Sequence, residues 1–320
     1  MSLPTVTIPK MNYRLVEVEG IYFPDLFAKD PAKRMSDIRN LRGKDDDVII
    51  AAYPKAGTHW VWEIANMLLT KSLEYHEKPK EALMMEMVET SELEDLPSPR
   101  IFNTHLRFRH LPEDMISRKC KLIHVIRNPK DMVVSRYNHV ARSKDSDYSG
   151  TFHEYFSLYL EGKIAFGSWF DYTQDWDNVI EQHKDYPIHV MVYEDIKLKP
   201  TEQILKLAEF LGVKIDEYFA KEVADRCSFT KLKDAHAHHK THFDATKANP
   251  FDYAFRKGTI GDWKNWFTVA EDEQFDALYA ERNIKKAFIY DLPKDTLIFS
   301  IIFLGLCYGL TVRKKNEAAF

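Results

Sequence analysis

The loop at residues 53–60 has the composition of an anion cradle, and it reads Tyr53-Pro54-Lys55-Ala56-Gly57-Thr58-His59-Trp60. It lies between an apolar run and a helical pattern, so backbone N–H groups and the helix dipole favour negative charge there. Gly57 allows the backbone to curl around a phosphate, Lys55 supplies a positive charge and Thr58 adds a hydroxyl group. The loop would thus do the task of a P-loop, with its lysine before the glycine. On spacing alone, an ordinary strand-to-helix turn with a surface lysine explains it equally well.

Two more cationic stretches are placed to bind a second anion. One runs from Arg127 to Ser135. Arg127 ends an apolar run and Ser135 lies about one helical turn into the next helix, so a guanidinium and a hydroxyl reach one crevice. The other stretch is Arg256-Lys257-Gly258. Two phosphate-type subsites on one crevice would suit a nucleotide that carries phosphate groups at both ends of its sugar.

The elements that must position these loops follow from the apolar patterning. Four apolar runs predict strands, at residues 48–53, 100–106, 121–127 and 188–193. Helices are predicted after residue 59, from about 130 to 143, and from 200 to a stop at 212. This alternation favours one α/β domain with a mainly parallel sheet flanked by helices. Ligands bind such sheets at the carboxyl ends of the strands, where the cationic loops lie.

Composition excludes several classes of protein. The 320 residues include 45 Lys and Arg against 49 Asp and Glu, a net charge of −4, which excludes a generally basic nucleic-acid binder. Cys120, Cys227 and Cys307 form neither a disulfide framework nor a zinc pattern, which favours a reducing compartment. The first twenty residues lack an apolar core, so no signal peptide is expected. The sequence contains no G-x-G-x-x-G fingerprint and no Walker A loop. The acidic run at 45–47 is expected to be a solvated loop.

Three stretches in this order resemble the cytosolic sulfotransferase family: YPKAGTHW at 53–60, RNPKDMVVSRYNH at 127–139 and RKGTIGDWKNWFT at 256–268. The resemblance extends from about Val18 to about Arg282. It implies a sulfotransferase domain at 1–290 with a P-loop-like phosphate-binding loop, and a C-terminal extension at 291–320. It also implies transfer of a sulfuryl group from 3′-phosphoadenosine 5′-phosphosulfate (PAPS) to a hydroxyl or amine of an acceptor. The product would be adenosine 3′,5′-bisphosphate (PAP), and no metal is needed.

The resemblance also assigns roles to individual residues. The 5′-phosphosulfate would be held by Lys55, Ala56, Gly57, Thr58, His59 and Trp60, with the Trp60 ring against adenine. The 3′-phosphate would be held by Arg127, Ser135, Arg256, Lys257 and Gly258, and the adenine and ribose by Tyr193, Cys227 and Phe229. His105 would be the base that takes the acceptor's proton during in-line attack, as a neutral imidazole can. Lys55 and Ser135 are the other expected catalytic residues.

Four positions depart from the family pattern. Asn103 stands where a lysine usually precedes the Thr-His pair, so a reduced rate is expected while nucleotide binding is kept. Ala56 replaces a common serine, and His59 and Cys227 replace common threonines; His59 offers a compensating hydrogen bond. These changes leave a second hypothesis open, a nucleotide-binding relative with weak or no catalysis.

Further expectations concern the surface. Lys264, Thr268, Val269 and Glu273 match the family's short dimerisation motif, which implies a homodimer; a solvated helix start is the alternative. A small, hydrophobic acceptor is the default. Its pocket is expected from Tyr22, Phe23, Met84–Met87, Phe108, Tyr148, Phe152, Trp169 and Phe170, each of which would serve equally as core. The resemblance makes residues 233–253, with His236, His238, His239 and His242, a lid, against an alternative of ordinary solvated loop histidines.

The C-terminal extension contains sixteen uncharged residues at 297–312, followed by Arg313-Lys314-Lys315. As a helix they would span about 24 Å, slightly short of a hydrocarbon core of about 30 Å. Gly305 and Gly309 have a spacing that suits helix pairing in lipid. A membrane anchor is slightly favoured over an apolar helix packed on the protein, and the enzyme body is expected to be cytoplasmic in both cases.

Overall fold

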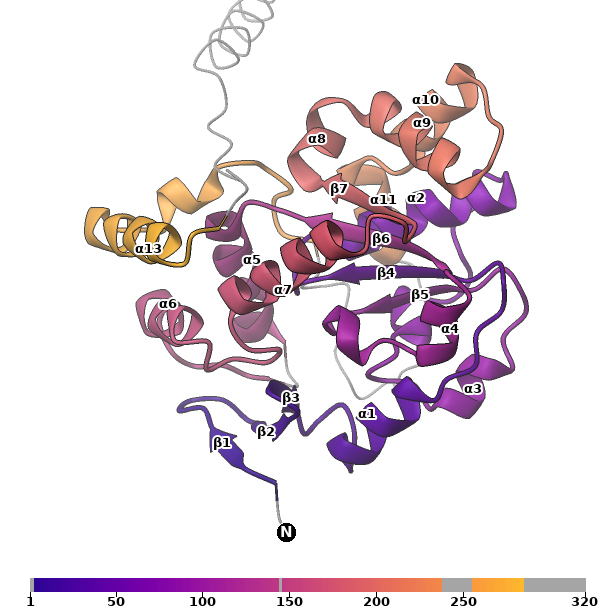
Figure 1. Cartoon of the computed structure of the whole chain (residues 1–320). Helices are drawn as coiled ribbons and strands as arrows, with labels where there is room; N and C mark the ends of the chain where they lie inside the picture. Colours follow the sequence, from indigo (N-terminus) through magenta and orange to yellow (C-terminus); the bar gives the residue numbers. More distant parts are fainter. Residues whose placement is uncertain (1–2, 144–145, 238–254, 285–320) are drawn as a thin grey trace, which may run out of the picture. The chain divides into compact units, whose positions relative to one another are not determined.

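A four-stranded parallel sheet forms the centre of the computed structural model, which describes residues 3–143, 146–237 and 255–284 (Figure 1). The strand order is β5-β4-β6-β7, and the strands are β4 (Val48–Ala52), β5 (Ile101–Thr104), β6 (Lys121–Ile126) and β7 (Ile188–Val192). β4 is buried along its whole length, as its run of apolar residues predicts for a strand covered on both faces. The predicted α/β sheet is therefore confirmed.

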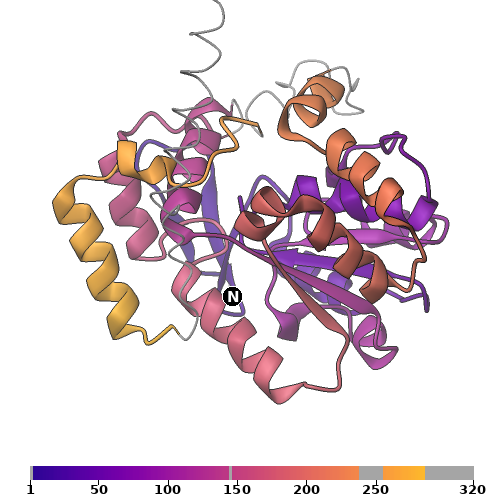
Figure 2. The ribbon, with the colours of Figure 1, turned by 90° about the horizontal axis from the view of Figure 1, so that it is seen from above.

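Helices cover both faces of this sheet, and the two views place α7 and α2 on opposite sides of it (Figures 1 and 2). The helices are α1 (Pro31–Arg39), α2 (Thr58–Thr70), α3 (Thr90–Glu94), α4 (Glu113–Ser117), α5 (Pro129–Arg142), α6 (Phe152–Leu160), α7 (Trp169–Gln182), α8 (Tyr193–Leu198), α9 (Pro200–Leu211), α10 (Glu217–Arg226), α11 (Phe229–Ala237) and α13 (Val269–Glu281). Three short 3₁₀ helices are η1 (Lys80–Leu83), η2 (Phe108–His110) and η3 (Asp262–Asn265).

The predicted boundaries of the central elements agree with the structure to within two residues. α9 begins at Pro200 and ends before Gly212, which takes the left-handed conformation at φ 77°. Ser135 is a small correction, because α5 begins at Pro129 and the serine therefore lies nearly two turns into the helix rather than one.

A second sheet near the N-terminus was not predicted. It is antiparallel and consists of β1 (Thr5–Thr7), β2 (Arg14–Val18) and β3 (Ile21–Pro24). Glu19 and Gly20, with φ of 51° and 77°, form a two-residue turn between β2 and β3, where positive φ at both positions matches the strand twist. These strands are short and lack a long apolar run, so periodicity alone does not reveal them.

The expectation for the acidic run at 45–47 is wrong at Asp47. Its carboxylate is buried and accepts two hydrogen bonds from the Arg100 guanidinium, at 2.7 and 2.6 Å. The Arg100 side chain is 1% exposed, so this is a buried bidentate ion pair. It joins the residue before β4 to the residue before β5, at the amino ends of the strands and opposite the cationic loops.

The predictions for the C-terminal part lie outside the described residues. Within the described ranges, no helix has both the length and the apolar character needed to cross a membrane. The apolar segment at 297–312 and the domain boundary at 290 fall beyond residue 284. Of the histidine-rich segment, residues 238–253 fall in the gap before residue 255.

Candidate active site

The loops after β4, β5 and β6 open onto one cavity of about 270 Å³. Most residues predicted to bind the nucleotide or act in catalysis line it: Lys55, Gly57, Thr58, His59, Trp60, His105, Arg127, Ser135, Tyr193, Cys227, Phe229, Arg256, Lys257 and Gly258. Ala56 is the exception, because its side chain is fully buried in the core and only its backbone belongs to the loop. Residues from six separate stretches of sequence thus meet at one place.

The loop after β4 has the geometry of an anion cradle. Gly57, at φ 110°, stands immediately before α2, and no side chain caps this end of the helix. A Cβ at Gly57 would lie 2.8 Å from Cδ2 of Tyr193, so only glycine lets the loop pass this ring. Lys55 also has positive φ, 75°, which is strained for a lysine and is typical of a functional loop.

Lys55 is a partly buried lysine in this cradle. Burial, together with the charges of Lys80 and Arg127, lowers the pKa of Lys55 to about 7. Its Nζ lies 3.3 Å from Nδ1 of His139. Among the described residues, no carboxylate comes within 4.0 Å of this ammonium, and Glu81 raises its pKa by less than Lys80 or Arg127 lowers it. A bound anion would therefore add the negative charge that favours the protonated form.

Arg127 lies beside the cradle, where β6 ends. Its Nη1 donates to the Lys55 carbonyl at 3.1 Å, and its guanidinium lies over the Tyr193 ring, 4.2 Å from the centroid. The same ring contacts Trp60 edge-on at 5.4 Å. Tyr193 therefore packs against both the cradle and Arg127. Ser135 adds a hydroxyl to the same wall from α5.

Arg256, Lys257 and Gly258 reach the cavity from the other side. Arg256 and Lys257 form ion pairs with Asp262, the second at 2.7 Å. Burial works to raise the pKa of Asp262, but the hydrogen bonds from Lys257 and Arg256 hold it at about 2. A Cβ at Gly258 would lie 2.3 Å from Cδ2 of Phe229. Both cations are thus already paired with one carboxylate, which balances only one of the two positive charges and which the sequence analysis did not single out.

His105 follows β5 and is held by two groups. Its Nδ1 lies 2.8 Å from the Ala52 carbonyl, which only accepts hydrogen bonds, so Nδ1 carries the proton and Nε2 of the neutral ring keeps its lone pair. Burial and the charge of Lys80 lower the pKa of His105 to about 3, so the ring is neutral at pH 7. Glu86 accepts hydrogen bonds from the Thr104 hydroxyl and the His105 amide and fixes this turn.

Several residues of the site were missed. Glu86 lies in the range Met84–Met87 that was expected to line the acceptor pocket, but its contact with the turn at His105 was not predicted. An acid inside such an apolar run is a signal that the sequence did contain. Burial raises its pKa to about 7. Lys80 and Glu81 gave no pattern, yet both line the cavity, and Glu81 Oε1 lies 2.8 Å from Nε2 of His59. In this structure His59 is thus paired with Glu81, and its compensating hydrogen bond to the nucleotide stays a prediction.

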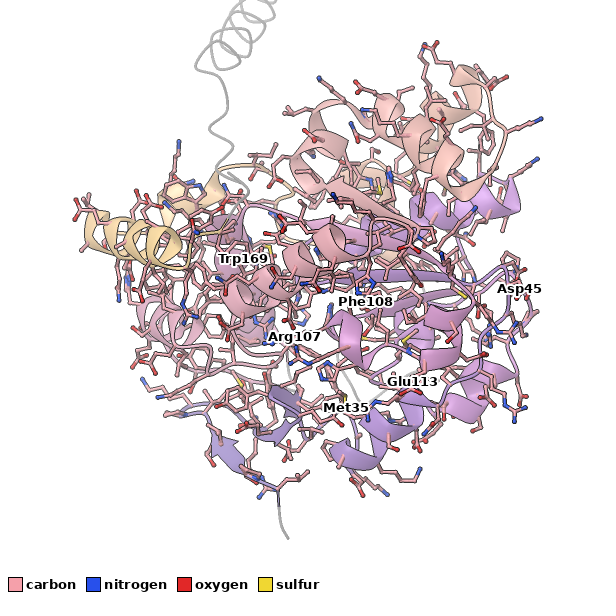
Figure 3. All side chains as sticks on the ribbon, in the orientation of Figure 1. Met35, Asp45, Arg107, Phe108, Glu113 and Trp169 are labelled. Atoms are coloured by element: carbon pink, nitrogen blue, oxygen red, sulfur yellow. The ribbon has the colours of Figure 1, made fainter. Side chains whose placement is uncertain are left out.

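The acceptor pocket is only partly the one expected. Met84 and Met87 line the cavity, together with the unpredicted residues Tyr13, Pro24, Leu26, Phe27, Val140 and Phe166. The cavity lining does not include Tyr22, Met85, Glu86, Phe23, Phe108, Tyr148, Phe152, Trp169 or Phe170. For example, the Trp169 ring stacks on Tyr279 with its centroid 6.1 Å away, and the Phe108 ring packs on Trp176 at 5.9 Å, so both are packing residues. Figure 3 labels these two side chains, Trp169 at the start of α7 and Phe108 on η2. Large aromatic residues near the motifs were thus a poor guide to the pocket.

The four residues of the predicted dimer motif, Lys264, Thr268, Val269 and Glu273, are exposed. Val269 is 76% exposed, an unusual value for an apolar side chain. Thr268 also caps α13, because its hydroxyl accepts from the Glu271 amide while the Glu271 carboxylate accepts from the Thr268 amide. The described residues include no group of three or more His, Cys, Asp or Glu side chains placed to hold a metal ion.

Comparison with known proteins shows which family has this sequence and fold. A model of the sulfotransferase domain matches residues 45–287. Human (Homo sapiens) sulfotransferase 1C2 is 34% identical over 280 residues, which cover 84% of this chain and 92% of that protein. Mouse (Mus musculus) sulfotransferase 1A1 is 35% identical over 278 residues, which cover 83% and 93%.

Solved structures of similar fold support the same family. Mouse sulfotransferase SULT7A1 complexed with PAP has a TM-score of 0.71 at 26% identity, covering 85% of this chain and 95% of that one. A retinol dehydratase in complex with androsterone and inactive cofactor PAP has a TM-score of 0.67 at 18% identity, covering 88% and 92%, and shows the fold alone. The three motifs, the cavity they share and these relatives lead to one assignment: the chain belongs to the sulfotransferase family.

Proposed function

We propose that this protein transfers a sulfuryl group from PAPS to a hydroxyl or amine of a small, mainly apolar acceptor. One observation carries the proposal: a single cavity brings together two cationic subsites and a neutral histidine at the carboxyl edge of the sheet. Two subsites match a donor with phosphate groups at both ends of its ribose. A relative that is 26% identical was crystallised with PAP, which supports the choice of nucleotide.

The residues present fit the donor. The uncapped start of α2 and the Lys55 ammonium, which has no carboxylate within 4.0 Å among the described residues, offer the positive charge that a 5′-phosphosulfate needs. Arg127, Ser135 and the segment 256–258 would hold the 3′-phosphate. Gly57 and Gly258 each pass so close to an aromatic ring that a Cβ would collide with it, which keeps the backbone near the ligand. The adenine and ribose would contact the other predicted residues, Trp60, Tyr193, Cys227 and Phe229.

His105 would act as the general base. Its Nε2 has a free lone pair because the Ala52 carbonyl holds the proton on Nδ1. A pKa of about 3 makes the free ring a weak base, and the anionic donor raises this pKa by placing negative charge beside it. Lys55 and the start of α2 would stabilise the charge that builds on the leaving phosphate, with Ser135 alongside.

The acceptor end of the cavity is lined mainly by apolar side chains, among them Leu26, Phe27, Met84 and Phe166. Such a surface selects an acceptor by shape and apolar contact, so a phenol or a hydrophobic alcohol fits best.

The first test is a thermal shift of the full chain with PAP, with adenosine 5′-phosphate as the control. Ligand at a hundred times its dissociation constant stabilises by about 2.7 kcal/mol, a shift of several degrees. Transfer is then assayed with labelled PAPS and a panel of phenols, alcohols and amines. No shift with PAP would contradict the proposal. A PAP-specific shift without transfer to any acceptor would instead favour the non-catalytic relative.

The homodimer is a second part of the proposal, supported by the match of Lys264, Thr268, Val269 and Glu273 to the family motif and by the exposure of Val269. Val269→Asp should shift the sedimentation of the full chain to that of a monomer, and an unchanged coefficient would contradict the dimer contact. Membrane attachment through 297–312 stays a prediction. Loss of the chain from the membrane fraction after deletion of 295–320 would test it.

A further inference from the structure

Lys80 is a buried lysine that the cationic motifs do not include. It opens η1, its side chain is 4% exposed, and it lines the cavity together with Lys55 and His105. Its Nζ donates to Oδ1 of Asn103 at 3.2 Å, and Nδ2 of Asn103 donates back to the Lys80 carbonyl at 2.6 Å. The Met85 amide also donates to the Asn103 carbonyl, at 3.1 Å. Asn103 therefore fixes η1, and with it the Lys80 side chain, against the end of β5.

The ammonium has one other partner among the described residues. Glu81 Oε1 lies 3.3 Å from Lys80 Nζ and 2.8 Å from Nε2 of His59. A lysine ammonium has three N–H donors, and Asn103 and Glu81 account for two. The charge of Lys80 lowers the pKa of Lys55, His59 and His105. It therefore acts on both sides of the reaction centre, on the anion cradle and on the expected base His105.

We propose that Lys80, positioned by Asn103, supplies the positive charge that contacts the transferred sulfuryl group. The inference rests on the proposed sulfotransferase function and deepens it. In the transfer step, the acceptor oxygen forms a bond to sulfur, the bond between sulfur and the bridging phosphate oxygen breaks, and that oxygen keeps the electron pair. The acceptor proton goes to Nε2 of His105. Lys80 takes no covalent part, and its remaining N–H donor stabilises the sulfuryl oxygens as charge shifts.

This arrangement gives Asn103 a different role from the one expected. Its neutral amide cannot itself act as a cation near sulfur, which led to the expectation of a slow enzyme. The structure shows the amide oxygen accepting from an ammonium that arrives from a neighbouring element. A lysine at position 103 would place a second positive charge against Lys80 and repel it. Residues 80 and 103 are therefore coupled, and only one of them can be the cation.

This coupling defines the experiment, which uses the full chain and the variants Lys80→Met, Asn103→Lys and the double substitution. Lys78→Met is the control, because Lys78 is exposed on the same segment. Lys80→Met should lower kcat at least 100-fold, as loss of a donor to a charged transition state does, with PAP affinity within about threefold because PAP has no sulfuryl group. Asn103→Lys alone should also lower kcat, and the double variant should recover at least tenfold over Lys80→Met.

A second readout does not depend on turnover. Removal of the Lys80 charge should raise the pKa of Lys55, so the loss of PAP affinity at alkaline pH should begin at higher pH in Lys80→Met than in the wild type. If Lys80→Met does not fold, Lys80→Gln keeps the hydrogen bond to Asn103 and serves the same purpose.

The outcomes separate the two proposals. A kcat for Lys80→Met or Lys80→Gln within threefold of wild type, with PAP still bound, would overturn the role of Lys80 and leave the proposed function standing. A double variant no better than Lys80→Met would also overturn it. A wild-type chain that binds no PAP would overturn the proposed function and, with it, this inference.

Discussion

The two cationic regions of the cavity are built in different ways. The loop at 53–58 connects a buried strand to a helix, and the backbone conformation of Lys55 and Gly57 fixes its shape. The segment 256–258 belongs to no regular element and is held by the Asp262 ion pairs. Asp131 of α5 fixes the adjoining turn by accepting from the Gly261 and Trp263 amides, at 2.7 and 3.0 Å.

This difference has an electrostatic consequence. In the first region, no carboxylate of the described residues lies within 4.0 Å of the Lys55 ammonium, so an arriving phosphate displaces no direct ion pair there. In the second region, a phosphate must compete with Asp262 for cations that are already paired. We therefore expect the first region to contribute most of the binding free energy, and the second to contribute less per charge.

His105→Ala gives the largest expected effect and separates binding by the two regions from the chemistry between them. Loss of a general base lowers kcat by about 10²- to 10⁴-fold. PAP affinity should stay within about threefold, since His105 lies outside both phosphate subsites. Transfer assays and calorimetric titration with PAP measure the two effects, with the exposed His153→Ala as the control. Near-normal turnover would remove His105 as the base.

Lys55→Met tests the first region directly. It removes the partly buried Lys55 ammonium, which forms no ion pair with the described residues, and we expect PAP affinity to fall about 100-fold, or about 2.7 kcal/mol. The melting temperature without ligand should not fall, because a lysine whose pKa is lowered by folding destabilises the folded protein. Calorimetric titration with PAP gives the affinity, and a loss below about fivefold would contradict the dominance of this region.

The pH dependence of PAP binding provides a finer test of the same group. The pKa of Lys55 is about 7 in the free protein, and bound phosphate raises it because it favours the charged form. Binding therefore takes up a proton above pH 7, and affinity should decline by up to about tenfold per pH unit there. Titrations in buffers of different ionisation enthalpy measure this uptake. The uptake should vanish in Lys55→Met; its persistence would assign the proton to another group.

Lys257→Met should have the smallest effect. The side chain is 51% exposed and already paired with Asp262, so we expect PAP affinity to fall by less than about fivefold. Comparison with Lys55→Met under the same buffer and salt conditions tests the contrast between the regions. Equal losses in the two variants would show that both regions bind phosphate by the same means.

Sequence was informative where the chain obeys local rules. The four strands, the helix from Pro200 to Leu211 and the two cationic loops follow from apolar runs, helix signals and loop composition. Sequence was uninformative where the chemistry depends on distant segments. Nothing local marks Lys80 as the partner of Asn103 or Asp262 as the partner of Arg256, since the register of η1 on β5 and the path of a loop bring them together. The prediction of the acceptor pocket was largely wrong for a related reason, because composition does not distinguish an aromatic residue that lines a cavity from one in the core.

The Asp47–Arg100 pair acts as an alignment device for the whole site. β4 ends in the loop of Lys55 and β5 ends at His105, so the offset between these two strands sets the spacing of cradle and base. A slip of one residue would displace one loop by about 3.3 Å along the sheet, more than a hydrogen bond tolerates. The ion pair joins the opposite ends of the same two strands, where Val48 stands across from Ile101. The accuracy of the reaction centre is thus set in part some five residues away, by a contact that never meets a substrate.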